Sequence, residues 1–207
     1  MFNIIIPINF NSPYKARNFQ DYWRRWHITL SKFLGAYVFR SVYKRDSKFR
    51  NYYIATMITF LVSGFWHGAG WTFIAWGIIN GIFVCTAAWM DRKGKKFPAV
   101  LAYTLTALGV VLTRVLFVSN GFSEAIVVYK GMIHFGGFQE FMNILRANVY
   151  EVFILLLGIG LCWFAPNSNE MVEKFKPSVR NMIFIAVIFV LALIQMNNVV
   201  QFLYFQF

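Results

Sequence analysis

The chain has 207 residues, of which 58% are hydrophobic and only 14% are charged, and its formal net charge is +12. This composition excludes an ordinary soluble domain, because the apolar residues gather into runs near the ~20 residues that a membrane-spanning helix needs. The charge does not indicate nucleic-acid binding: ten Lys or Arg fall within residues 1–50, the others lie mainly in short loops, and no nucleic-acid motif accompanies them. We interpret the cations as topology signals and contacts with the lipid bilayer.

The N-terminal 50 residues begin with a segment rich in turn-forming residues, so residues 1–17 are predicted to be extended or looped. A helix is predicted to follow, with Asn18 as its N-cap and Asp21 in its first turn. Because apolar residues then recur at helical spacing, we expect one continuous amphipathic helix at the membrane interface. Its apolar face is predicted to carry Trp23, Trp26, His27, Leu30 and Leu34.

The rest of the chain alternates apolar runs with short polar segments, which indicates an all-α fold. Three runs are long enough to span a membrane, namely 71–90, 98–118 and 181–197 with its flanks. A fourth run, 149–165, follows a polar lead-in, and a fifth, 52–66, is short enough to be tilted or re-entrant. The prediction is a polytopic transmembrane helix bundle of about five spans or re-entrant segments plus the interfacial helix.

The loops differ in charge, and this difference predicts the orientation. The segment 91–97 carries four cations and 166–180 carries three, whereas 119–142 carries only Lys130 against two Glu. No charged side chain follows Asn198. Since positive loops stay on the cytoplasmic side, we expect 91–97 and 166–180 to be cytoplasmic and the C-terminus to face outward.

Two histidines lie in tryptophan-rich frames, YWRRWHITLS at residues 22–31 and SGFWHGAGW at 63–71. His67 ends an apolar run, where an ionisable group is costly unless it is used or paired. The glycines around it permit a helix break, and irregular backbone at membrane depth is tolerated only within protein or around a cavity. His67 and His27 therefore suggest a buried active site, although a lone histidine in an apolar segment is more often structural.

Three motifs occur in order along the chain: NFNSPYKARNFQDYWRRWHITLSKFL, SGFWHGAGW and the terminal FLYFQF. They resemble the membrane-bound O-acyltransferase (MBOAT) family, within it the bacterial branch of alginate O-acetylases, peptidoglycan O-acetyltransferases and teichoic-acid D-alanyl transfer proteins. The resemblance runs from residue 3 to residue 207. Members of the family carry several further spans before NFNSPYKA, so it implies that residues 1–207 are the C-terminal part of a single MBOAT domain, a fragment of a longer protein.

The resemblance implies an O-acyltransferase that moves an acyl group, acetyl above all, from a cytoplasmic thioester to an extracytoplasmic cell-envelope polysaccharide. The donor would be acetyl-CoA or the phosphopantetheine arm of an acyl carrier, and no cofactor would be bound permanently. A separate extracytoplasmic partner, an SGNH-type acylesterase-like protein with a Ser-His-Asp site, would reach the polymer. The location implied is the bacterial cytoplasmic membrane, which the chain would cross several times.

Acyl transfer to a hydroxyl needs a base beside the attacking oxygen, and neutral histidine meets this need near physiological pH. The resemblance implies that His67 is the catalytic histidine and that His27 accompanies it, with orientation of the site or substrate binding as the alternative for His27. No metal is implied, because neither histidine has another ligand at coordinating spacing.

Four further residues are candidates for substrate binding. Trp66 and Trp26 would line an acyl or pantetheine tunnel, with core packing or interfacial anchoring as the equal alternative. Arg24 and Arg25 would meet a phosphate of coenzyme A or of the carrier arm, and anchoring to lipid headgroups is their alternative role.

Tyr204 lies in the terminal aromatic motif. A phenol has a pKa near 10, far below that of an alcohol, so its ester is the more activated acyl carrier. The resemblance implies that Tyr204 accepts the acyl group and presents it outside, whereas an interfacial aromatic anchor is the alternative. For the whole chain, the rival interpretation is a non-catalytic membrane fragment or a transporter half with buried polar residues.

Overall fold

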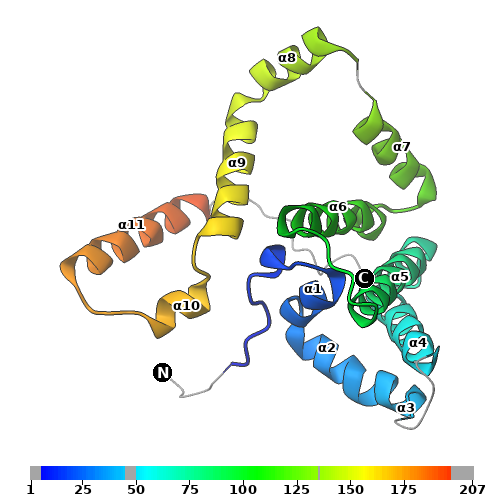
Figure 1. Ribbon diagram of the computed structural model, residues 1–207. Helices are drawn as coiled ribbons and strands as arrows, with labels where there is room; N and C mark the ends of the chain where they lie inside the picture. Colours follow the sequence, from blue (N-terminus) through cyan, green and yellow to red (C-terminus); the bar gives the residue numbers. More distant parts are fainter. Residues whose placement is uncertain (1–5, 45–49, 135, 197–207) are drawn as a thin grey trace. The chain divides into compact units, whose positions relative to one another are not determined.

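The computed structural model describes residues 6–44, 50–134 and 136–196, and in these ranges the regular structure is helical, without β-strands, as the sequence predicts. The chain divides into two units, Met1–Ala165 and Pro166–Phe207. Helices of the first unit are α1 (Phe19–Arg25), α2 (Ile28–Leu34), α3 (Arg40–Val42), α4 (Arg50–His67), α5 (Trp71–Arg92), α6 (Ala99–Val118), α7 (Phe122–Ile133), α8 (Phe138–Ala147) and α9 (Val149–Phe164) (Figure 1). A short 3-10 helix, η1 (Pro13–Lys15), precedes α1, and a π-helical segment, η2 (Gly35–Phe39), lies between α2 and α3. The second unit holds α10 (Ser168–Glu173) and α11 (Val179–Gln195).

Helices α5 and α6 are long and apolar enough to cross a membrane, which confirms the spans predicted at 71–90 and 98–118. The predicted span 149–165 corresponds to α9, which qualifies only together with α8, to which it is joined at an 86° bend. Helix α11 has 17 residues and does not qualify alone, and the end of its predicted run, residue 197, lies outside the described residues. The described residues thus contain two or three candidate membrane spans, as expected of a membrane protein.

The predicted run 52–66 forms the core of α4, which is 18 residues long but does not count as a span. The polar ends of α4 explain the difference, since its 18 residues include Arg50, Asn51 and His67. Thr56 and Ser63, in the middle of the helix, are buried within the protein.

Helices α4 and α5 form an antiparallel hairpin, the most extensive helix contact of the first unit. Two glycines let the backbones touch: a Cβ on Gly77 would meet the carbonyl oxygen of Phe60, and one on Gly64 would meet the carbonyl oxygen of Phe73. Small residues at such a crossing are the usual device for close packing of membrane helices. The hairpin thereby sets the position of His67 at the end of α4.

We expect Gly77→Val to lower the melting temperature of the full-length protein, because the new side chain must push the backbones of α4 and α5 apart. Overpacking of this kind costs about 1–3 kcal/mol. Gly158→Val in α9 is the matched control, since a Cβ there meets nothing within 4 Å. Thermal unfolding in detergent measures both variants, and equal melting temperatures would contradict the close crossing.

The N-terminal segment is anchored on α5 and α6 by α1. The ring of Phe19 packs on that of Phe83 with centroids 4.4 Å apart and occupies the space that a side chain at Gly109 would need. Trp23 meets the buried Trp76 of α5 with ring centroids 5.6 Å apart. These contacts hold the start of the chain beside the α4–α5 hairpin.

The prediction of one continuous helix through His27 is wrong. Asn18 caps α1 as predicted, its Oδ1 accepting a hydrogen bond from the Asp21 amide at 2.8 Å. The helix then stops at Arg25, Trp26 is extended and His27 adopts the left-handed conformation before α2 begins. Hydrogen bonds from the preceding segment satisfy the backbone at this break, and helical periodicity contains no signal for them.

Candidate functional site

His27 occupies the break between α1 and α2 with φ 45° and ψ 54°. Only Asn, Asp and Gly adopt this conformation readily, and for other residues it costs about 1–2 kcal/mol. Such strain in a folded protein tends to gather at functional sites, where the surrounding structure enforces it. The backbone conformation of His27 therefore indicates a functional position, independently of the tryptophan-rich motif.

His67 ends α4 among aromatic rings. Its imidazole lies edge-on to Trp66, Trp76 and Phe117, with ring centroids 4.8, 5.3 and 4.9 Å away. The ring of Trp66 also meets that of His27, with centroids 6.4 Å apart. One tryptophan thus touches both histidines, and it brings together residues that the sequence separates by a whole helix.

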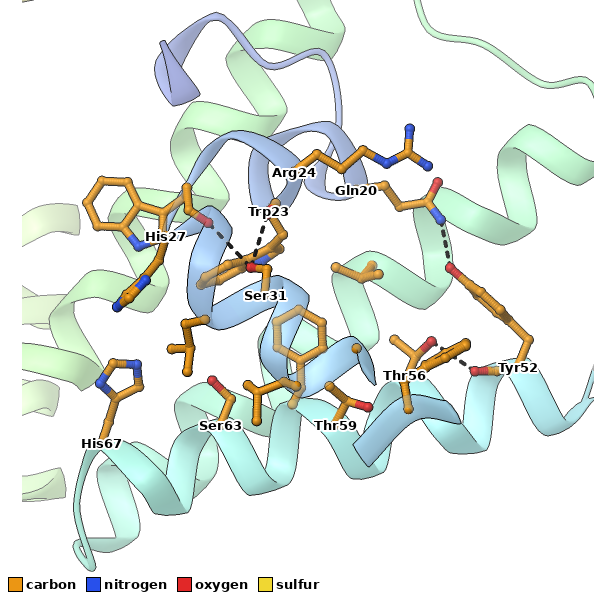
Figure 2. Close-up of a pocket in the computed structure, with 17 residues that line it drawn as sticks. Gln20, Trp23, Arg24, His27, Ser31, Tyr52, Thr56, Thr59, Ser63 and His67 are labelled. Carbon is orange, nitrogen blue, oxygen red and sulfur yellow. Dashed lines mark hydrogen bonds between the residues drawn. The ribbon is translucent and has the colours of Figure 1, made fainter. Parts of the chain in front are cut away.

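Both histidines line one cavity of about 390 Å³ between the α1–α2 segment and α4 (Figure 2). Small-molecule sites in proteins have volumes of roughly 300–1,000 Å³. Figure 2 shows His27 and His67 facing one another at one end, with Gln20 and Tyr52 at the other. At that end the Gln20 amide donates a hydrogen bond of 2.9 Å to the Tyr52 hydroxyl.

The wall that α4 contributes is a stripe of polar side chains. They recur at helical spacing, so they share one face of the helix. Along α4 this stripe runs for roughly 22 Å at 1.5 Å per residue. Its members are Tyr52, Thr56, Thr59, Ser63 and His67.

The predicted substrate-binding residues separate into two groups. Trp26 and Arg24 line the cavity, with Arg24 beside Gln20 in Figure 2. Arg25 lies outside the lining and forms an ion pair of 2.8 Å with Asp21. Trp66 contacts both histidine rings from beside the cavity, and its side chain is half exposed.

Sequence reasoning missed the hydroxyls of α4 and the part played by Ser31. A signal existed for the first, because residues 52, 56, 59, 63 and 67 follow helical spacing and end at His67. None existed for Ser31, which bonds carbonyls freed by the helix break. Tyr204 lies outside the described residues.

Two ring nitrogens of cavity-lining residues are buried and lack a hydrogen-bond partner within the described residues. They are Trp23 Nε1 and His27 Nδ1. Burial also lowers the pKa of His27 below its usual 6.5, which favours the neutral imidazole that can accept a proton. Among the described residues, no group of three or more His, Cys, Asp or Glu could hold a metal ion. Neutral imidazoles and hydroxyls in an apolar setting suit proton transfer.

Comparison with known proteins matches the sequence to one family. The model of the membrane-bound O-acyltransferase family matches residues 1–129. The chain is 36% identical to the peptidoglycan O-acetyltransferase of Helicobacter pylori over 84% of its own length and 37% of that protein. It is 34% identical to the probable alginate O-acetylase AlgI of Pseudomonas aeruginosa, covering 68% of the chain and 27% of that protein.

A third relative is the teichoic acid D-alanyltransferase of Streptococcus thermophilus, 39% identical over 42% of the chain and 23% of that protein. The chain thus spans about a third of the length of the curated relatives that it matches. The family match covers more than half of the chain and includes both histidines, α4, α5 and α6. The chain belongs to the membrane-bound O-acyltransferase family.

Proposed function

We propose that the full-length protein moves an acyl group from a cytoplasmic thioester to a cell-envelope polysaccharide outside the bacterial cytoplasmic membrane. The observation that carries this proposal is the cavity in which His27 and His67 face one another. Acetyl is the proposed acyl group, because the Helicobacter and Pseudomonas relatives are named for its transfer.

The chemistry requires one base and one activated acyl donor. The acceptor hydroxyl attacks the thioester carbonyl and gives its proton to a neutral histidine, for which we propose His67. Collapse of the tetrahedral intermediate breaks the carbon–sulfur bond, and the proton passes to the departing thiolate. The products are an oxygen ester and a free thiol, so no metal or redox partner is needed.

The donor is proposed to be acetyl-CoA or the phosphopantetheine arm of an acyl carrier, lying along the hydroxyl stripe of α4. A narrow cavity with polar atoms spaced along one wall suits such an arm. Arg24, at the Tyr52 end, would meet the phosphate, because guanidinium groups pair well with phosphate oxygens. Loop charges favour the cytoplasm for this end, since the basic segment 40–50 immediately precedes Tyr52.

The acceptor side is proposed to involve Tyr204 and a second protein. Tyr204 would take the acyl group as a phenyl ester at an outward-facing C-terminus. An extracytoplasmic partner with a Ser-His-Asp site would then pass it to the polysaccharide. The charge-poor segments 119–142 and 198–207 support this orientation.

Filling the cavity tests the proposal. Thr59→Trp in the full-length protein should lower acyl transfer from a thioester by about tenfold or more, because the indole occupies the middle of the donor path. Thr104→Trp is the control, since Thr104 lies on an exposed part of α6 away from the cavity. Transfer is measured as thiol released at matched protein level. Unchanged transfer in Thr59→Trp would refute a donor in this cavity.

A further inference from the structure

The left-handed conformation of His27 needs support from elsewhere in the chain. Within the described residues, only Ser12 and His27 combine a side chain with positive φ. His27 stands at the N-cap of α2, yet its side chain makes no capping hydrogen bond. The first amides of α2 must therefore find acceptors outside their own helix.

Asn9 supplies those acceptors. Its main-chain oxygen accepts a hydrogen bond from the Ile28 amide at 2.9 Å. Its side-chain Oδ1 accepts two more, from the Thr29 amide at 3.1 Å and the Thr29 hydroxyl at 2.9 Å. A residue from a distant part of the chain thus does for α2 what an N-cap side chain ordinarily does.

Contacts from the same segment also hold the end of α1, on the other side of the break. The Asn11 amide donates to the Arg25 carbonyl at 2.9 Å, and the Phe10 ring packs on Trp26 with centroids 4.9 Å apart. The Ser31 hydroxyl lies within hydrogen-bond distance of the Trp23 and Trp26 carbonyls, at 3.2 and 3.4 Å. The segment 9–11 therefore contacts the backbone on both sides of His27.

We propose that Asn9 is a positioning residue: as an external cap of α2, it keeps α1 and α2 apart and so directs the His27 imidazole into the cavity. The alternative backbone is the continuous helix that the sequence pattern favours, in which residue 27 would take ordinary helical angles. Its ring would then point in a different direction. This inference rests on the proposed role of His27 in acyl transfer.

The test uses the full-length protein and compares Asn9→Ala with Asn9→Asp. Loss of Oδ1 in Asn9→Ala should lower kcat by about tenfold, the effect of losing a helix cap. The donor KM should change little, because the α4 wall of the cavity is untouched. Asn9→Asp keeps an acceptor oxygen for Thr29 and should retain kcat within about threefold. Equal losses in the two variants would overturn the hydrogen-bonding role.

His27→Asn separates this inference from the function on which it rests, because Asn tolerates the left-handed conformation and removes only the imidazole. Full activity in His27→Asn would refute the role of His27 itself. If His27→Asn is inactive and Asn9→Ala is fully active, the positioning role of Asn9 is refuted, whereas the proposed role of His27 stands.

Thr29→Val decides the matter if Asn9→Ala fails to accumulate in the membrane. This substitution removes the hydroxyl that donates to Asn9 Oδ1. The main-chain amide of residue 29, which donates to the same oxygen, is kept. A fall in kcat of about threefold supports the external cap, since one of its hydrogen bonds is lost. An unchanged kcat overturns it.

Discussion

His67→Ala is expected to abolish envelope O-acylation by the full-length protein while its membrane level stays normal. A positioned acid–base group contributes about 10²–10⁴-fold to rate, so loss of at least about 100-fold is expected. The residue stands where α4 ends, on the cavity wall opposite His27. Ester content of the envelope polymer, measured after mild alkaline release, reports the effect.

The third histidine of the chain provides the control. His134 follows α7, outside the cavity that His27 and His67 line. His134→Ala should leave ester content within about twofold of the wild type, the range expected for a surface substitution. Near-normal ester content in His67→Ala would reject its catalytic role and favour a non-catalytic membrane module.

Tyr204→Phe is expected to abolish polymer acylation as well, because it removes the phenolic oxygen and keeps the aromatic ring. In the proposed orientation residues 198–207 face outward, and ten residues would cover about 30 Å if they were extended, at 3.3 Å per residue. Mass spectrometry of the C-terminal peptide should find the acyl ester on Tyr204.

Tyr150→Phe, which removes a phenol from the exposed start of α9, serves as the matched control and should acylate normally. If Tyr204→Phe also acylates normally, the acyl group passes directly to another acceptor and the tail is an interfacial anchor.

Much of the fold was predictable, because helices in a membrane must be long and apolar. Hydropathy alone located α5 and α6, and the capping chemistry of Asn18 located the start of α1. The end of α1 was not predictable, since the backbone there is held by hydrogen bonds that Asn9 accepts and that the Asn11 amide donates. Local sequence favours a helix there, and tertiary contacts overrule it.

Of the candidate site, too, one part was predictable from the sequence and another was not. The motifs singled out His27 and His67 as a pair, and the structure places both on one cavity. The helical period predicts that the adjacent Arg24 and Arg25 point in different directions, but which of them faces the cavity depends on tertiary packing and could not be foreseen. Arg24 lines the cavity, whereas Arg25 pairs with Asp21.

The hydroxyls of Thr56 and Thr59 leave this part of the cavity wall able to accept hydrogen bonds but not to donate them. Each donates its only proton to its own helix, to the carbonyls of Tyr52 and Ala55 at 2.8 and 2.7 Å. Only lone pairs remain for whatever lies beside them. Amide N–H groups and hydroxyls find acceptors along this stretch of α4, whereas phosphates and carboxylates meet repulsion. The wall therefore favours ligands that donate hydrogen bonds, and an anionic end group is favoured only at the end where Arg24 lies.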